Sequence, residues 1–86
     1  MKKLWTDKAW KNYLDWQTDK KTLRKINDLI KDIERSPFTG IGKPEPLKHS
    51  LSGWWSRHID DAHRIVYRIK DGYLEISQCK GHYNDK

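Results

Sequence analysis

The chain is 86 residues long, 35% hydrophobic and 35% charged, which describes a single domain over residues 1–86 with a limited core. Its one Cys excludes an intrachain disulfide and a zinc site of several thiolates, and it has neither an apolar run of roughly 20 residues nor a signal-peptide stretch, so we expect a cytoplasmic protein with no membrane partner. Eighteen Lys and Arg against 12 Asp and Glu give a net charge of +6, which indicates a polyanionic partner or else a basic surface that serves solubility.

The N-terminal part of the chain has the pattern of a short strand followed by a helix. Residues 3–5 are typical of the strand, and Thr6 or Asp7 is a suitable N-cap for a helix over about residues 8–17. The apolar positions of this helix lie mostly at helical spacing; they are Ala9, Trp10, Tyr13, Leu14 and Trp16. We therefore expect an aromatic-rich face that is buried in the core.

A second helix follows a break at Thr18-Asp19. Its apolar residues repeat at intervals of three and four; they are Leu23, Ile26, Leu29, Ile30 and Ile33. Ser36-Pro37 ends this helix, because the residue before a proline avoids helical backbone angles. Residues 36–46 then hold three Pro and two Gly, which predicts a shaped loop rather than a regular element.

The remaining half of the chain has the alternation and the turns of a β-sheet. The predicted strands are residues 47–49, 54–59, 63–69 and 73–79. Helices followed by hairpins indicate an α+β domain, with the two helices packed on one face of a mainly antiparallel sheet of four to five strands. We expect the other face of the sheet to be open.

Strand alternation sorts the residues of HRIVYRI between the two faces of this sheet. The set expected to meet the helices is Ile65, Tyr67 and Ile69, and the set expected on the open face is Arg64, Val66 and Arg68. His58 shares the open face if Ile59 belongs to the core. A guanidinium there could present its fork to phosphate. Ordinary solvated sheet residues are the alternative interpretation, favoured for Arg68 and His58 taken singly.

Four segments in a fixed order carry a family resemblance: GKPEPLKH at 42–49, SGWWSRHI at 52–59, HRIVYRI at 63–69 and CKGHY at 79–83. Together with WTDKAWKNYLDWQ and INDLIKDIERSPF, they make the chain resemble the YoeB (Txe) toxins of the RelE/ParE superfamily over essentially its whole length. The resemblance implies a RelE-like, microbial-ribonuclease-like fold. It also implies the toxin of a type II toxin-antitoxin system, a ribosome-dependent endonuclease that cuts mRNA in the A site and inhibits translation. The implied partners are the ribosome, mRNA and a silencing YefM-type antitoxin, and a homodimer is a further assembly to test.

Carried over by motif, the resemblance implies a catalytic set without metal or cofactor: Glu45, Arg64, His82 and Tyr83. It further implies that Lys48 and His58 bind the substrate. Metal-free RNA cleavage needs a base for the ribose 2′-OH and an acid for the leaving 5′-oxygen, roles that suit Glu45 and His82. Arg64 would neutralise the phosphate, and Tyr83 would stack on a base or orient the phosphate. From the residues alone, a solvated loop carboxylate and a frayed tail are the favoured interpretations of Glu45 and His82.

Two features depart from the family pattern. The chain continues through residues 84–86, whereas some relatives stop at the tyrosine, so a free carboxylate beside the site is not expected. His58 stands at a position where an arginine would fit the family, which would make a phosphate contact there pH-dependent. Two other functions stay open: a ParE-like toxin that poisons DNA gyrase by contact, and an RNA-binding module without turnover. Only catalysis requires the combined set of Glu45, Arg64 and His82.

Overall fold

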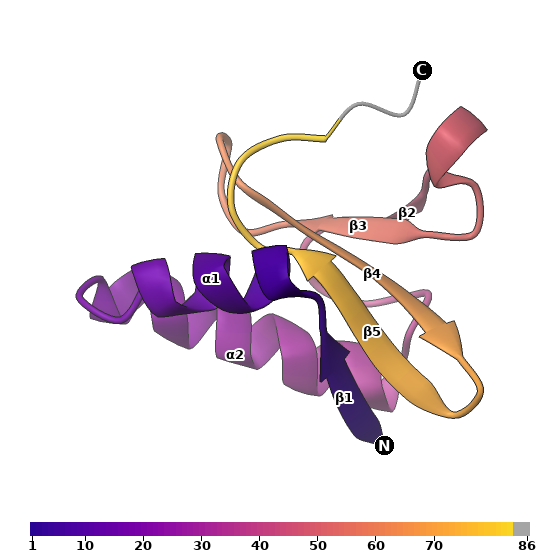
Figure 1. Cartoon of the computed structure of the whole chain (residues 1–86), viewed down its shortest axis with the longest axis horizontal. Coiled ribbons are helices and arrows are strands. Elements are labelled where there is room, and N and C mark those ends of the chain that lie inside the picture. The colour runs from indigo at the N-terminus through magenta and orange to yellow at the C-terminus, as the bar shows by residue number, and fades with distance from the viewer. Residues whose placement is uncertain (84–86) are drawn as a thin grey trace.

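In the computed structural model, which describes residues 1–83, two helices cover one face of a five-stranded sheet (Figure 1). The elements are β1 (Lys2–Trp5), α1 (Asp7–Asp15), α2 (Lys20–Arg35), β2 (Glu45–Pro46), a 3₁₀ turn η1 (His49–Leu51), β3 (Trp55–His58), β4 (Arg64–Lys70) and β5 (Tyr73–Gln78). The strand order is β1-β5-β4-β3-β2, and every pair is antiparallel except β1 with β5. The predicted α+β architecture with a mainly antiparallel sheet is confirmed.

Both helices begin at the residues whose side chains can cap them. The Thr6 hydroxyl accepts the Ala9 N–H at 3.1 Å, and the Asp19 carboxylate accepts the Thr22 N–H, also at 3.1 Å. The stripe of α2 packs against the sheet in one core; its buried members are Ile26, Leu29, Ile30 and Ile33. Within residues 1–83, neither helix is long and apolar enough to cross a bilayer.

The aromatic face of α1 is only partly buried, which corrects the sequence prediction. Ala9 is in the core and Tyr13 is half-buried, but Trp10 is 47% exposed and Leu14 is 50% exposed. These side chains are exposed because α1 packs on β1 and β5, at the edge of the sheet. Among the described residues, no strand or helix covers the outer part of its apolar face.

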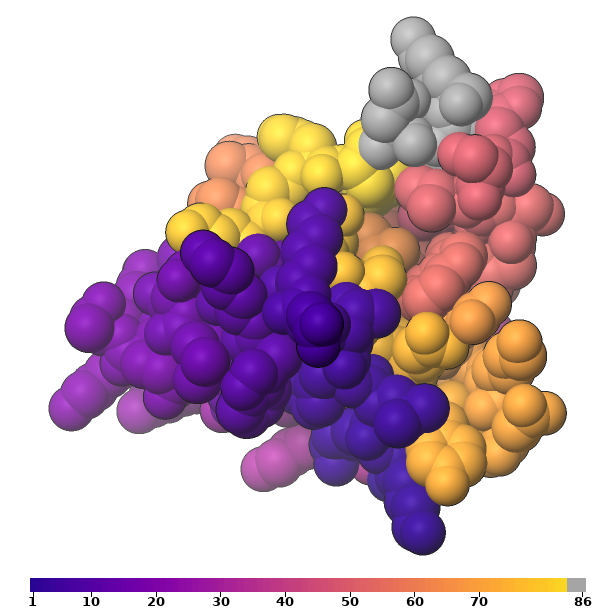
Figure 2. Space-filling view, in the orientation of Figure 1, coloured from indigo at the N-terminus to yellow at the C-terminus, as the bar shows by residue number. Residues whose placement is uncertain are grey.

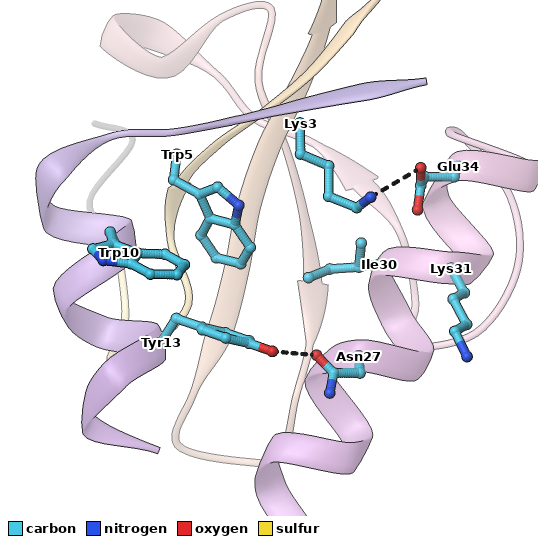
Figure 3. A pocket seen from close by; sticks show the side chains of 8 residues that line it. All are labelled: Lys3, Trp5, Trp10, Tyr13, Asn27, Ile30, Lys31 and Glu34. Atoms are coloured by element: carbon cyan, nitrogen blue, oxygen red, sulfur yellow. Dashed lines mark hydrogen bonds and ion pairs between the residues drawn. The ribbon is translucent and has the colours of Figure 1, made fainter. Parts of the chain in front are cut away.

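Aromatic rings of β1 and α1 line a groove between α1 and α2 (Figure 3). Trp10 stacks on Tyr13 with ring centres 5.7 Å apart and meets Trp5 edge-on at 5.6 Å. On the other wall, Asn27 accepts a hydrogen bond from the Tyr13 hydroxyl at 2.8 Å. Three aromatic rings in mutual contact therefore form one wall of this groove.

The prediction of a strand at residues 47–49 is wrong. The chain pairs with β3 earlier, at Glu45–Pro46, and then turns through η1. Leu47 is buried, and its N–H bonds to the Trp54 carbonyl at 2.9 Å. A proline can occupy β2 because this strand is the sheet edge, where one backbone N–H is dispensable.

The sheet face away from the helices is not open throughout. Ile65 and Tyr67 face the helices and are fully buried, as alternation predicts. Ser56 and Val66 on the opposite face are also buried, because residues 79–83 turn back over that face after β5 (Figure 1). In Figure 2 this yellow segment lies on the surface between α1 and the residues around η1.

Arg57 carries a charge into the core on the helix side of β3. Its side chain is completely buried, and Nη1 forms an ion pair with Asp32 of α2 at 2.6 Å. Its Nε donates to the Tyr67 hydroxyl at 3.1 Å. The remaining N–H groups donate to three carbonyls of the loop after α2: Ser36 at 2.7 Å, Thr39 at 2.9 Å and Ile41 at 3.1 Å. The loop that leads to β2 is therefore anchored from inside the core.

The ion pair predicts a pH dependence of stability. The Arg57 guanidinium, with the Ile41 N–H and Arg35, lowers the pKa of Asp32 from 3.8 to about 2. A lowered carboxyl pKa stabilises the fold above the unfolded value and loses that contribution as the pH falls through the folded value. Asp32→Asn should therefore unfold at less urea than the wild type at about pH 7. We expect this difference to shrink between about pH 4 and about pH 2.

Urea titrations of both proteins at several pH values measure the effect. Asp28→Asn, at an exposed position of the same helix, is the matched control and should unfold close to the wild type throughout. A difference between Asp32→Asn and the wild type that stays constant down to about pH 2 would show that the carboxylate charge contributes nothing.

Candidate active site

Most candidate residues fall on two neighbouring rows of the sheet face opposite the helices. The first row crosses four strands through the pairs Glu45↔Ser56, Ser56↔Val66 and Val66↔Gln78. The second row, two residues along β3, is the pair His58↔Arg64. Adjacent strands lie about 4.8 Å apart, and residues two apart along a strand are separated by about 6.7 Å. Strand pairing alone therefore gathers Glu45, His58 and Arg64 into one patch.

Tyr83 joins this patch from the C-terminal segment. Its hydroxyl donates to Glu45 Oε1 at 2.9 Å and lies 3.0 Å from Ser56 Oγ. A phenol has one hydrogen, so the Ser56 hydroxyl is the donor when Tyr83 donates to Glu45. Two predicted site residues that are 38 positions apart are thus in direct contact.

Arg64 is more constrained than a side chain on an open face would be. Its Nη1 donates to three carbonyls of the turn before β4: Asp60 at 2.7 Å, His63 at 3.1 Å and Asp61 at 3.2 Å. Among the described residues, its Nε and Nη2 have no protein acceptor. One edge of the guanidinium is held by the turn, and the other edge can take the oxygens of an anion.

The neighbouring Arg68 has a structural role. It forms an ion pair with Glu75 at 2.8 Å and lies over the Trp54 ring at 4.4 Å. These contacts agree with the interpretation of Arg68 as an ordinary sheet residue.

The other candidates lie at the margin of the patch. His82 is exposed, and among residues 1–83 no hydrogen bond joins its imidazole to Glu45, Arg64 or Tyr83. Lys48 is exposed just before η1, and His58 is half-buried. The extension, residues 84–86, lies outside the described residues.

Residues 79–81 are held to the body of the protein by hydrogen bonds from three directions. Trp16 Nε1 donates to the Cys79 carbonyl at 2.9 Å, and the Asn12 side chain accepts the Cys79 N–H at 3.1 Å. The Gly81 N–H donates to His63 Nδ1 at 2.8 Å. The chain leading to His82 and Tyr83 is a fixed part of the fold rather than a frayed tail.

Sequence reasoning missed three residues that build this site: Ser56, His63 and Gln78. Ser56 lies on the same face of β3 as His58, but a buried serine gives no sequence signal. The Gln78 amide donates to the His82 carbonyl at 2.9 Å. Gln78 reaches this face only because β5 has an irregularity between Ile76 and Gln78, which shifts the alternation by one residue. Such a bulge cannot be read from the sequence.

The site offers acid-base and phosphate-binding groups rather than a nucleophilic thiol. Burial raises the pKa of Cys79 to about 12, so this thiol stays protonated in the core. Within residues 1–83, no group of three or more His, Cys, Asp or Glu side chains is arranged to hold a metal ion. The groups on the exposed patch are a carboxylate, a phenol, imidazoles and a guanidinium.

Known proteins with similar sequences and structures agree on one family. The sequence model described as "YoeB-like toxin of bacterial type II toxin-antitoxin system" matches residues 5–83. Toxin YoeB of Escherichia coli K12 is 56% identical over 84 residues, covering 96% of this chain and 100% of the relative. A solved YoeB/ParE toxin from Agrobacterium tumefaciens is 50% identical with a TM-score of 0.94, covering 96% of this chain and 100% of that one.

A further solved relative, YoeB of Staphylococcus aureus, is 42% identical with a TM-score of 0.89, covering 96% of this chain and 98% of that one. It has been solved as a dimer and as a heterotetrameric complex with YefM. The matches extend from the first strand to the C-terminal segment that carries Tyr83. This chain therefore belongs to the YoeB-like toxin family of bacterial type II toxin-antitoxin systems.

Proposed function

We propose that this toxin is an endoribonuclease that cuts mRNA in the ribosomal A site by acid-base catalysis without metal, and so inhibits translation. The observation that carries the proposal is the contact between Tyr83 and Glu45 beside Arg64, on an exposed sheet face. A base and a guanidinium that stabilises the phosphate charge are two of the groups that cleavage through a 2′-OH needs, and His82 supplies the acid. The net charge of +6 suits an RNA substrate.

In the proposed reaction, Glu45 takes the proton of the ribose 2′-OH, and the 2′-oxygen attacks the adjacent phosphorus. Arg64 stabilises the extra charge on the phosphate oxygens. The bond to the 5′-oxygen then breaks as His82 donates a proton to that oxygen. The products are a 2′,3′-cyclic phosphate and a free 5′-hydroxyl. We assign Lys48 and His58 to the RNA backbone, since His58 pairs directly with Arg64 across the sheet.

The Tyr83 hydroxyl has a defined place in this proposal. It holds the Glu45 carboxylate and is itself held by Ser56, which favours an orienting role for the hydroxyl over base stacking alone. A carboxylate that is fixed in one rotamer already has an oxygen oriented toward the 2′-OH, so less conformational entropy is lost in reaching the reactive geometry. Tyr83 would thus act on the base of the reaction rather than on the nucleobase of the RNA.

The proposed partners follow from charge and family. The S. aureus relative assembles with YefM, and we infer a YefM-type antitoxin whose acidic segment covers the patch around Arg64. The ribosome and mRNA are the substrate complex, and a homodimer is a second assembly, as the S. aureus dimer suggests. A buried free thiol at Cys79 suits the reducing cytoplasm, where we place the protein.

Two other functions make different demands on the site. A ParE-like poison of DNA gyrase, or an RNA-binding module without turnover, needs a basic surface but not the contact between Tyr83 and Glu45. That contact favours the nuclease. Transcripts that stay intact on translating ribosomes, together with DNA damage, would favour the gyrase poison.

Cleavage of mRNA on translating ribosomes tests the proposal directly. We expect a 2′,3′-cyclic phosphate end, formed at a rate that needs no divalent metal beyond what intact ribosomes require. His82→Ala and Arg64→Ala should each reduce the single-turnover rate by about 10²- to 10⁴-fold, the usual contribution of an acid-base group. His49→Asn and Arg24→Ala, at exposed positions outside the patch, are the matched controls and should cut normally. Wild-type rates in both site variants would refute the catalytic assignment.

The role of the Tyr83 hydroxyl is separable from that of its ring. Tyr83→Phe keeps the ring but leaves Glu45 without its donor. A hydrogen bond to a charged group contributes about 1.5 to 3 kcal/mol, so the single-turnover rate should fall by roughly 10- to 150-fold. Tyr83→Ala should be only slightly slower than Tyr83→Phe. If Tyr83→Phe cuts like the wild type while Tyr83→Ala fails, stacking is the role of this residue.

A further inference from the structure

His63 and Arg64 form hydrogen bonds with both backbone polar groups of Gly81. His63 Nδ1 accepts the Gly81 N–H at 2.8 Å, and the Arg64 N–H donates to the Gly81 carbonyl at 3.0 Å. This pair of bonds resembles one more rung of the sheet, with a ring nitrogen in place of a carbonyl. Gly81 is the residue directly before His82, so these two bonds fix where the site segment starts.

His63 is itself held through both its ring and its backbone. Its ring packs edge-on against the Trp16 ring, with centres 4.9 Å apart at 84°. Its backbone N–H donates to Asp60 Oδ1 at 2.7 Å, and its carbonyl accepts the Ile59 N–H at 2.9 Å. A half-buried residue whose backbone is fixed and whose ring packs on Trp16 can set the position of Gly81 closely.

We propose that His63 is a positioning residue, whose neutral imidazole holds residues 81–83 over the sheet face so that His82 and Tyr83 meet the substrate. This inference rests on the proposed function of those two residues. Gly81 has no side chain and a φ of 80°, so the bonds of its backbone are the direct hold on it. Loss of the Nδ1 acceptor leaves the Gly81 N–H without its partner and lets the segment move.

The hydrogen bond also fixes the protonation state that His63 requires. Nδ1 accepts only when it carries no proton, so the single ring proton sits on Nε2. A second proton, on Nδ1, would turn the acceptor into a donor that faces the Gly81 N–H, and the hydrogen bond would be lost. The charged groups of the surrounding elements are Asp60 in the turn, Arg64 on β4, and Asp15 and Lys80, which form an ion pair at 3.3 Å beside Trp16.

Catalysis then needs two imidazoles in opposite states. His82 must be protonated to serve as the acid, and His63 must be neutral to hold Gly81. The rate should therefore fall when His63 takes up a second proton, and it should fall when His82 loses the proton that it donates.

Nuclear magnetic resonance of the full-length toxin tests the bond without any ribosome. A scalar coupling across the hydrogen bond should connect the Gly81 amide nitrogen to His63 Nδ1, and it should disappear as His63 takes its second proton. The Gly81 amide should then exchange faster with solvent. A proton found on Nδ1 of the neutral ring, or a Gly81 amide that exchanges like an exposed one at every pH, would overturn the inference.

Single-turnover cleavage by His63 variants tests the consequence. His63→Ala removes the acceptor and should lower the rate at saturating ribosomes by on the order of 100-fold, as expected for a misplacement of about 1 Å, with little change in KM. His63→Asn supplies an amide oxygen near the place of Nδ1, so it should keep the rate within about tenfold of the wild type, and this oxygen takes up no second proton that would break the bond.

The outcomes separate this inference from the proposed function. If the coupling is present but the wild type cuts no RNA, the nuclease proposal fails and the positioning bond stands. If His63→Ala loses the bond yet cuts at the wild-type rate, the positioning role is wrong. Should His63→Ala not fold, His63→Gln is the second variant. Its acceptor lies one bond farther out, so it should be slower than His63→Asn, and equal rates would contradict the inference.

Discussion

The buried guanidinium of Arg57 is the constraint on which the arrangement of this small domain depends. A charge inside a protein is tolerated only when a counter-charge and full hydrogen bonding surround it. Arg57 meets that condition with five N–H groups and five acceptors, three of them carbonyls of the loop after α2. Gly40 passes so close to the Asp32 carboxylate that a Cβ would collide with it. A Pro- and Gly-rich segment thereby becomes part of the core and delivers Glu45 to the edge of the sheet.

The candidate site forms where this loop meets a second irregular segment, residues 79–83. Helix α1 and the start of β4 hold that segment through Trp16, His63 and the backbone of Arg64. The two segments touch at the hydrogen bond from Tyr83 to Glu45. Glu45 lies on the short edge strand β2 at the end of the first segment, and Tyr83 lies outside any strand or helix, yet both segments are tied to rigid elements. A site on exposed loops can be ordered in this way, because each loop has its own hydrogen bonds to the scaffold.

Particular residues explain which predictions were correct. The stripe of α2, the capping residue Thr6 and the break between the helices at Thr18-Asp19 follow local rules, and all were confirmed. The prediction that Val66 lies on an open surface was wrong, because residues 79–83 cover that face of the sheet. Alternation along β4 cannot reveal a covering segment that comes 13 or more residues later in the chain. The prediction that Trp10 and Leu14 are buried was also wrong. Burial depends on which element packs against a helix face, and α1 lies at the edge of the sheet.

The sequence by itself determined the class of fold, the family and the identity of the candidate residues, because periodicity, capping and ordered motifs are properties of neighbouring residues. Glu45, Arg64, His82 and Tyr83 could all be named from their motifs. Only the tertiary structure decided that Tyr83 meets Glu45, that one edge of Arg64 is held by carbonyls, and that His63 holds Gly81. These contacts join segments far apart in the chain through strand register, a bulge in β5 and a buried ion pair. Their geometry exists only once the core has packed, so no local pattern encodes it.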